Sequence, residues 1–152
     1  MSLINKEKSL YVMGLILAIL LILSGCGKDR KEINVKADTG ETVQATLQLG
    51  DDFDMNESSG VLMVYQKKKV MLQVAFINEE QRKSHIDHMR NSNMTEVLQE
   101  EGKSISYKKA SAQGLVNYFI FPVGEKTYAY AATYLPEEAA KSVLNRLEFQ
   151  KK

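Results

Sequence analysis

The sequence predicts an α+β fold, in which an antiparallel sheet of about five to six strands carries one central helix and one C-terminal helix. Three observations support this class. Several segments alternate polar and apolar residues with a period of two, short turn segments separate them, and two segments change to a helical period. Strands joined by tight turns pair antiparallel, so the expected order is β-β-β-α-β-β-β-α.

The first strands precede the central helix. The segment Thr42–Leu49, "TVQATLQL", alternates strictly and predicts a half-buried strand. The acidic, turn-rich segment from 50 to 60 is expected to be an exposed loop. A hairpin follows, in which Val61–Gln66 and Val70–Ile77 flank a lysine turn at Lys67–Lys69. Both of its strands are apolar on both faces, which favours central positions in a sheet.

The central helix is predicted to begin at Asn78. Asn78 and Gln81 have the spacing of a capping box, and the two glutamates between them suit the positive end of the helix dipole. The apolar stripe that follows is interrupted by "RNSN" at positions 90–93. We therefore expect a break there and a second short helix from Thr95.

Three strands and a helix complete the predicted fold. The strands are expected at Ser104–Lys109, Leu115–Val123 and Lys126–Leu135, with a tight turn between the last two. In the last strand small residues alternate with tyrosines, and the small side should lie under a helix because it permits close approach. Pro136 suits the first position of that helix. Its apolar side chains recur on one face: Ala140, Val143, Leu144 and Leu147.

The order of these elements, the hairpin sequence "VGEKTYAYAATY" and the closing helix that ends in "RLEF" resemble the Mog1/PsbP-like α/β sandwich of several secreted bacterial lipoproteins. The resemblance covers the chain from about Val43 to Phe149. It implies a sandwich fold, and it implies no particular chemistry because the family shares none.

The N-terminal segment has the layout of a secretory signal. Lys6 and Lys8 precede an apolar run of 14 residues, Leu10–Leu23, and small residues follow it. A membrane-spanning helix needs about 20 apolar residues, so this run is too short to cross a bilayer comfortably.

The only cysteine of the chain, Cys26, follows this run in the sequence "LSGC", which resembles the lipobox of bacterial lipoproteins. The resemblance implies that the Cys26 thiol receives a diacylglyceryl group and that the signal is cut between Gly25 and Cys26. Two acyl chains anchor a protein stably, whereas a single chain holds it only marginally. In the alternative interpretation, Cys26 is a buried residue of an uncleaved signal anchor.

Three regions are therefore predicted: a removed signal peptide at 1–25, a lipidated cysteine with a flexible tether at 26–41, and a single α+β domain at 42–152. The tether is charged and lacks a sustained apolar period. As a random coil it would reach roughly 20 Å, which keeps the domain close to the bilayer. In the alternative, Ile33 and Val35 begin a first edge strand.

Charge content excludes one class of partner, and cysteine content excludes an intramolecular disulfide. The chain has 20 Lys plus Arg and 19 Asp plus Glu, and 18 of each remain from Cys26 onward. A nucleic-acid groove needs a basic surplus, so no nucleic-acid partner is expected. One cysteine permits no intramolecular disulfide, and the fold must depend on packing.

Two polar clusters are candidate metal sites. One lies in the predicted acidic loop: Asp51, Asp52, Asp54 and Glu57. Its spacing does not match an EF-hand. His85 and His88 lie three residues apart, unlike the i, i+4 spacing of zinc proteases. We interpret both clusters as solvated surface, and we expect no metal or other cofactor.

Four tyrosines mark a candidate binding surface around the C-terminal hairpin: Tyr118, Tyr128, Tyr130 and Tyr134. Tyrosine combines a large apolar area with a polar tip, and recognition surfaces are rich in it. In the alternative interpretation, these rings fill the second half of the core beneath the central helix.

We therefore expect a lipid-anchored protein on the extracytoplasmic face of the cell membrane, acting as a non-catalytic binding or accessory module with an envelope protein as partner. The alternative is a small extracytoplasmic enzyme with dispersed catalytic residues. The sequence has no G-x-S-x-G, no H-E-x-x-H and no glycine-rich phosphate loop, so no catalytic residue is expected.

Overall fold

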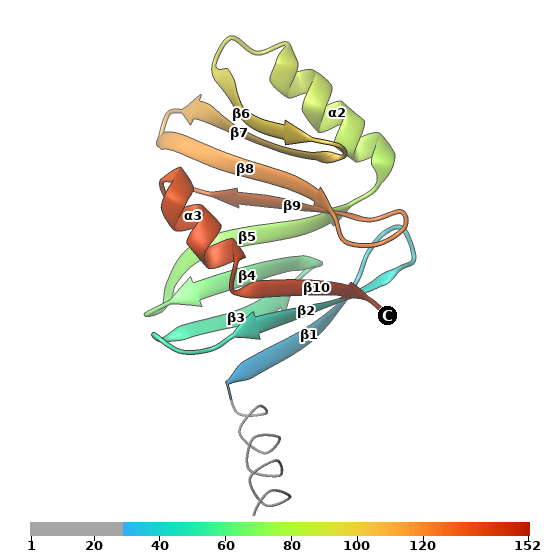
Figure 1. The fold of residues 1–152 in the computed structure, drawn as a ribbon, viewed down its shortest axis with the longest axis vertical. Coiled ribbons are helices and arrows are strands. Elements are labelled where there is room, and N and C mark those ends of the chain that lie inside the picture. The colour runs from blue at the N-terminus through green and yellow to red at the C-terminus, as the bar shows by residue number, and fades with distance from the viewer. Residues whose placement is uncertain (1–28) are drawn as a thin grey trace, which may run out of the picture. The chain divides into compact units, whose positions relative to one another are not determined.

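The computed structural model describes residues 29–152, so the predicted signal peptide, Gly25 and Cys26 lie outside the described residues. The described part holds two helices and ten strands in two largely antiparallel sheets (Figure 1). Among these residues no helix has the length and apolar character needed to cross a bilayer.

The larger sheet of the described part has the order β3-β4-β5-β9-β8-β7-β6. Its strands are β3 (Phe53–Ser58), β4 (Val61–Gln66), β5 (Lys69–Ile77), β6 (Thr95–Glu101), β7 (Ser104–Ser111), β8 (Gly114–Pro122) and β9 (Tyr128–Thr133). The smaller sheet has the order β1-β2-β10. Its strands are β1 (Arg30–Lys36), β2 (Thr42–Gln48) and β10 (Leu147–Lys151). The helices are α2 (Glu79–Arg90) and α3 (Glu137–Leu144).

The α+β class, the mostly antiparallel pairing and the two helices are confirmed, whereas the predicted number and order of strands match only in part. Part of the expected flexible tether forms β1, as the alternative interpretation held, and Val35 is buried there. The expected acidic loop contains β3, in which Met55 is fully buried. The expected second helix from Thr95 is the edge strand β6, and β10 follows α3.

Side-chain alternation divides the core into two apolar layers, one on each face of the larger sheet. On the first face, Leu62 and Val74 pack with the smaller sheet and with α3. Ala131 of β9 and Ala140 of α3 belong to this layer, as expected for a small-residue surface beneath a helix. On the second face, Ile86 and the rest of α2's buried side chains pack against β5, β7, β8 and β9.

The start of α2 is fixed by the predicted capping box. Asn78 Oδ1 accepts a hydrogen bond from the Gln81 N–H at 2.8 Å, and Gln81 Oε1 accepts one from the Asn78 N–H at 2.9 Å. Because β5 ends at Ile77, the cap turns the chain back over the second face of the sheet immediately. This position of α2 determines which tyrosines are covered.

Candidate functional site

The second face of the larger sheet is only partly covered by α2. Cross-strand register places one row of side chains across five neighbouring strands: Met63, Gln73, Ala132, Tyr118 and Tyr107. Tyr107 at one end of the row is buried, whereas Gln73 in β5 is exposed. We call this row, together with Tyr130 and Tyr134, the tyrosine face.

Three tyrosine rings and one histidine ring stack on the tyrosine face. The ring centres of Tyr107 and Tyr118 lie 4.9 Å apart with planes inclined by 17°, and those of Tyr118 and Tyr130 lie 5.6 Å apart at 13°. His85 of α2 stacks on Tyr130 at 4.2 Å and 18°. Because the rings hold one another in place, they form a continuous and ordered aromatic ledge beside the helix.

The ledge is accessible along one side. Tyr118 and Tyr130 are half-buried, and Tyr134 is 60% exposed, with its hydroxyl donating to Gln113 Oε1 at 2.8 Å. A hollow of about 350 Å³ is lined by Tyr118, Ala132 and Tyr134 among others. Aromatic surface and polar hydroxyls are therefore presented together at this face.

The stacked rings are uncharged at neutral pH. Burial raises the pKa of the Tyr107, Tyr118 and Tyr130 hydroxyls above the usual value for tyrosine. Burial, and next the neighbouring His88, lower the pKa of His85. The ledge thus offers neutral rings and hydroxyl donors, which suit an apolar or aromatic ligand group better than a charged one.

Tyr128 lies in the core, so for this residue the alternative interpretation is correct. Its ring is 3% exposed, with the Arg82 guanidinium 5.2 Å and the Lys103 ammonium 5.8 Å from its centre. Tyr128 pairs with Ile77, the last residue of β5 before the α2 cap. The helix therefore covers this row, whereas Tyr118, Tyr130 and Tyr134 lie in rows farther from the cap.

Sequence reasoning missed two members of the ledge. Tyr107 lies in β7 directly opposite Tyr118, and His85 was interpreted as part of a solvated helix face. The tyrosine in the alternating segment "SISYKK" is the sequence signal that indicated one more ring on the side of the sheet that carries Tyr118. The register between β7 and β8, which brings the two rings together, depends on tertiary pairing.

No group of three or more His, Cys, Asp or Glu side chains among residues 29–152 is placed to hold a metal ion. Carboxylates of the acidic segment have other partners: Asp51 pairs with Arg146 at 2.6 Å, and Asp54 pairs with Lys31 at 2.6 Å.

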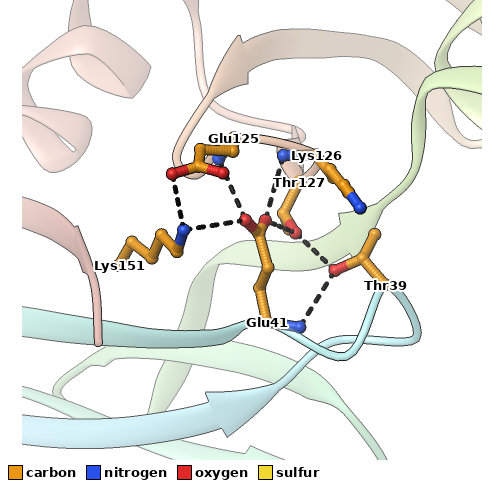
Figure 2. A network of polar contacts seen from close by, with 6 residues as sticks. All are labelled: Thr39, Glu41, Glu125, Lys126, Thr127 and Lys151. Carbon is orange, nitrogen blue, oxygen red and sulfur yellow. Dashed lines mark hydrogen bonds and ion pairs between the residues drawn. The ribbon is translucent and has the colours of Figure 1, made fainter.

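A partly buried carboxylate cradle, which sequence reasoning also missed, joins the two sheets (Figure 2). Glu41 Oε1 accepts from the Glu125 N–H at 3.1 Å, and Oε2 accepts from the Lys126 N–H at 3.1 Å. The Thr127 hydroxyl donates to Oε2 at 2.6 Å. A Cβ atom at Gly124 would lie 2.6 Å from Oε2, so this turn needs glycine to approach the carboxylate. The contact fastens the β1–β2 turn to the β8–β9 turn.

Replacing this carboxylate should remove an acid-sensitive part of the stability. The pKa of Glu41 lies below its usual 4.5, first because of the Thr127 hydroxyl, and also because of the turn N–H groups and Lys151. Its stabilisation is therefore complete above about pH 4.5 and is lost as the pH falls through the lower folded-state pKa. Glu41→Gln should melt at a lower temperature than wild type at pH 7 and lack this part of the pH dependence.

Thermal melts between pH 7 and pH 3 test this expectation. Glu138→Gln is the matched control, because that side chain is 93% exposed. Wild-type and Glu41→Gln melting curves that run parallel over the whole pH range would contradict it.

No family model, curated protein or solved structure matches the chain. The similarity to the Mog1/PsbP-like sandwich and to the lipobox therefore stays a prediction from the sequence.

Proposed function

We propose that the chain is a membrane-anchored extracytoplasmic lipoprotein, held by a lipid on Cys26, that uses the tyrosine face to bind an envelope protein. The observation that supports the binding role is the half-open stack of Tyr118 and Tyr130 beside the exposed Tyr134. The sequence around Cys26 supports the anchor, because an acceptor thiol follows a short apolar run directly.

The composition of the tyrosine face favours a protein partner. The row around Tyr118 has no charged side chain, and it combines aromatic rings with the small Ala132 and the polar Gln73. The cores of protein interfaces are depleted in charge and enriched in tyrosine. The rings are already stacked in the free chain, so binding costs little side-chain entropy.

A photo-reactive amino acid at Gln73 tests the proposal in intact cells. Gln73 is exposed and lies next to Ala132 in the row, so the probe reports on a partner without removing a core side chain. We expect one envelope protein to be captured, and we expect Tyr118→Ala to lower the capture by about 30-fold, the effect of an interface hot spot. Tyr118→Phe, which keeps the ring, should restore it.

The matched control places the same probe at Ser142, an exposed residue of α3 on the opposite side of the sheet. Equal capture of the same protein from Ser142, or capture from Gln73 that survives Tyr118→Ala, would exclude the tyrosine face as the binding surface.

A further inference from the structure

One end of the domain gathers the start of β1 and the turn between β4 and β5, at the lower left of Figure 1. The Lys31 ammonium lies 2.6 Å from Asp54 at the start of β3. The Lys67 N–H donates to the Asp52 carbonyl at 3.1 Å, and this bond ties the β4–β5 turn to the loop just before β3. The chain therefore enters the domain beside the lysine turn. The Glu41 cradle lies at the other end of these strands.

The lysine turn carries positive charge that its surroundings do not neutralise. Lys67, Lys68 and Lys69 are all exposed, and within residues 29–152 none of the three forms an ion pair. Of the nearby carboxylates, Asp51 and Asp54 already pair with other cations, which leaves Asp52. A positive surplus thus remains at this end of the molecule.

The turn's own geometry does not account for these lysines. Gln66 pairs with Lys69, so Lys67 and Lys68 are the two central residues of the hairpin turn. Both have positive φ angles, 49° and 66°, the conformation in which Asn-Gly is strongly preferred. Two lysines at strained positions suggest that their charge serves something other than folding.

Exposed apolar side chains lie at the starts of β5 and β8, which are both on the left of Figure 1. β5 and β8 both pair antiparallel with β9, so they run in the same direction and begin at the same end of the sheet. Val70 at the start of β5 is 48% exposed, and Leu115 at the start of β8 is 57% exposed. Lysines beside exposed apolar residues are the combination found where proteins meet a membrane interface.

We propose that this end of the domain rests on an anionic membrane surface, with the lysine turn at the lipid headgroups and Val70 and Leu115 at the interface. This inference rests on the proposed lipid anchor. Lys31 follows Cys26 by five residues, which span at most about 18 Å, so a lipidated Cys26 keeps this end at the bilayer. Tyr134, whose hydroxyl donates to Gln113 two residues before Leu115, lies at this end, and Tyr118 and Tyr130 follow it farther from the membrane along the strands.

A variant with a better turn and less charge tests the proposal. Lys67→Asn with Lys68→Gly installs the preferred turn residues, so its melting temperature should equal or exceed that of wild type. Each lysine near an anionic surface strengthens attachment about five-fold, so the pair of substitutions should weaken docking about 25-fold. Lys36→Gln with Lys83→Gln removes two exposed lysines elsewhere and is the matched control.

The reporter is a single tryptophan, because the chain has none. Leu115→Trp marks the docking end and Lys126→Trp the opposite end. Each chain is expressed with its own leader in a bacterial host, extracted and reconstituted into vesicles. The vesicles consist of phosphatidylcholine with brominated lipid, and they are prepared with or without about 30% phosphatidylglycerol. We expect strong quenching of Leu115→Trp on anionic vesicles only, and little quenching of Lys126→Trp on either kind of vesicle. The quenching of Leu115→Trp should be lost in the turn variant. It should also be lost at about 1 M salt, where the Debye length is about 3 Å.

Mass spectrometry of the same preparations separates the two proposals. A lipidated Cys26 with equal quenching at both tryptophans, or with quenching that the turn variant leaves unchanged, overturns the docking orientation and leaves the anchor standing. An unmodified Cys26 overturns the anchor and the docking together.

Discussion

A Cys26→Ser chain is expected to carry no lipid and to accumulate as the full-length precursor. The lipobox resemblance implies that lipid addition precedes cleavage, and Cys26 is the only thiol of the chain. At about 0.8 kcal/mol for each buried CH2, two acyl chains supply an anchor that a serine hydroxyl cannot replace in this pathway. The loss of lipid addition and of cleavage should therefore be complete rather than partial.

Intact-mass measurement of the membrane fraction checks this expectation. The wild-type chain should begin at Cys26 and carry the lipid mass, whereas Cys26→Ser should retain residues 1–25. Ser24→Ala keeps a small residue before the cleavage point and should be processed like wild type. An unmodified wild-type chain in the cytosol would contradict the anchor, as would a Cys26→Ser chain cut elsewhere and released in soluble form.

The elements that were predicted correctly have local sequence patterns that identify them without any knowledge of tertiary contacts. β2 alternates strictly, the β4–β5 hairpin is apolar on both faces, and α2 begins with the reciprocal hydrogen bonds of Asn78 and Gln81. α3 follows Pro136, which is its N-cap, with a clear apolar face, but it ends at Leu144, and Leu147, expected on that face, begins β10 instead. In these segments, periodicity and capping chemistry agree with the tertiary environment.

The strands that were missed lie at sheet edges or in the smaller sheet, where few positions are buried. β3 buries Met55 alone, so acidic and polar residues fill the rest of the strand and give it the composition of a loop. In β6 the register shifts between Val97 and Gln99, which breaks the period of two, and its Glu, Gln and Leu residues favour helix. Pairing with β7 overrides that preference.

The candidate site also has features that the sequence could predict and features that depend on the tertiary arrangement. The sequence indicated which residues alternate toward the tyrosine side, and this was enough to name Tyr118, Tyr130 and Tyr134. It could not indicate that β9 lies between β5 and β8, because that order joins segments far apart in the chain. The burial of Tyr128 and the stacking of His85 both follow from this order and from the position of α2.

Ala131→Leu is expected to destabilise the domain strongly. Ala131 is fully buried, with Val74 and Phe119 as its cross-strand neighbours, and it shares the first core layer with Ala140 of α3. The larger side chain has no space unless α3 moves away from the sheet. Overpacking of this kind costs about 3 kcal/mol, which should lower the melting temperature by about 10 °C in a domain of this size.

Ala132→Leu is the matched control, because the same side chain is added one residue later on the opposite face of β9. Ala132 is half-buried between Gln73 and Tyr118 on the tyrosine face, where no helix covers it. We expect the melting temperature of Ala132→Leu to stay close to wild type while capture through Gln73 falls, because the added side chain fills part of the proposed contact surface. Equal melting temperatures for the two variants would show that α3 does not depend on the small side chains of β9.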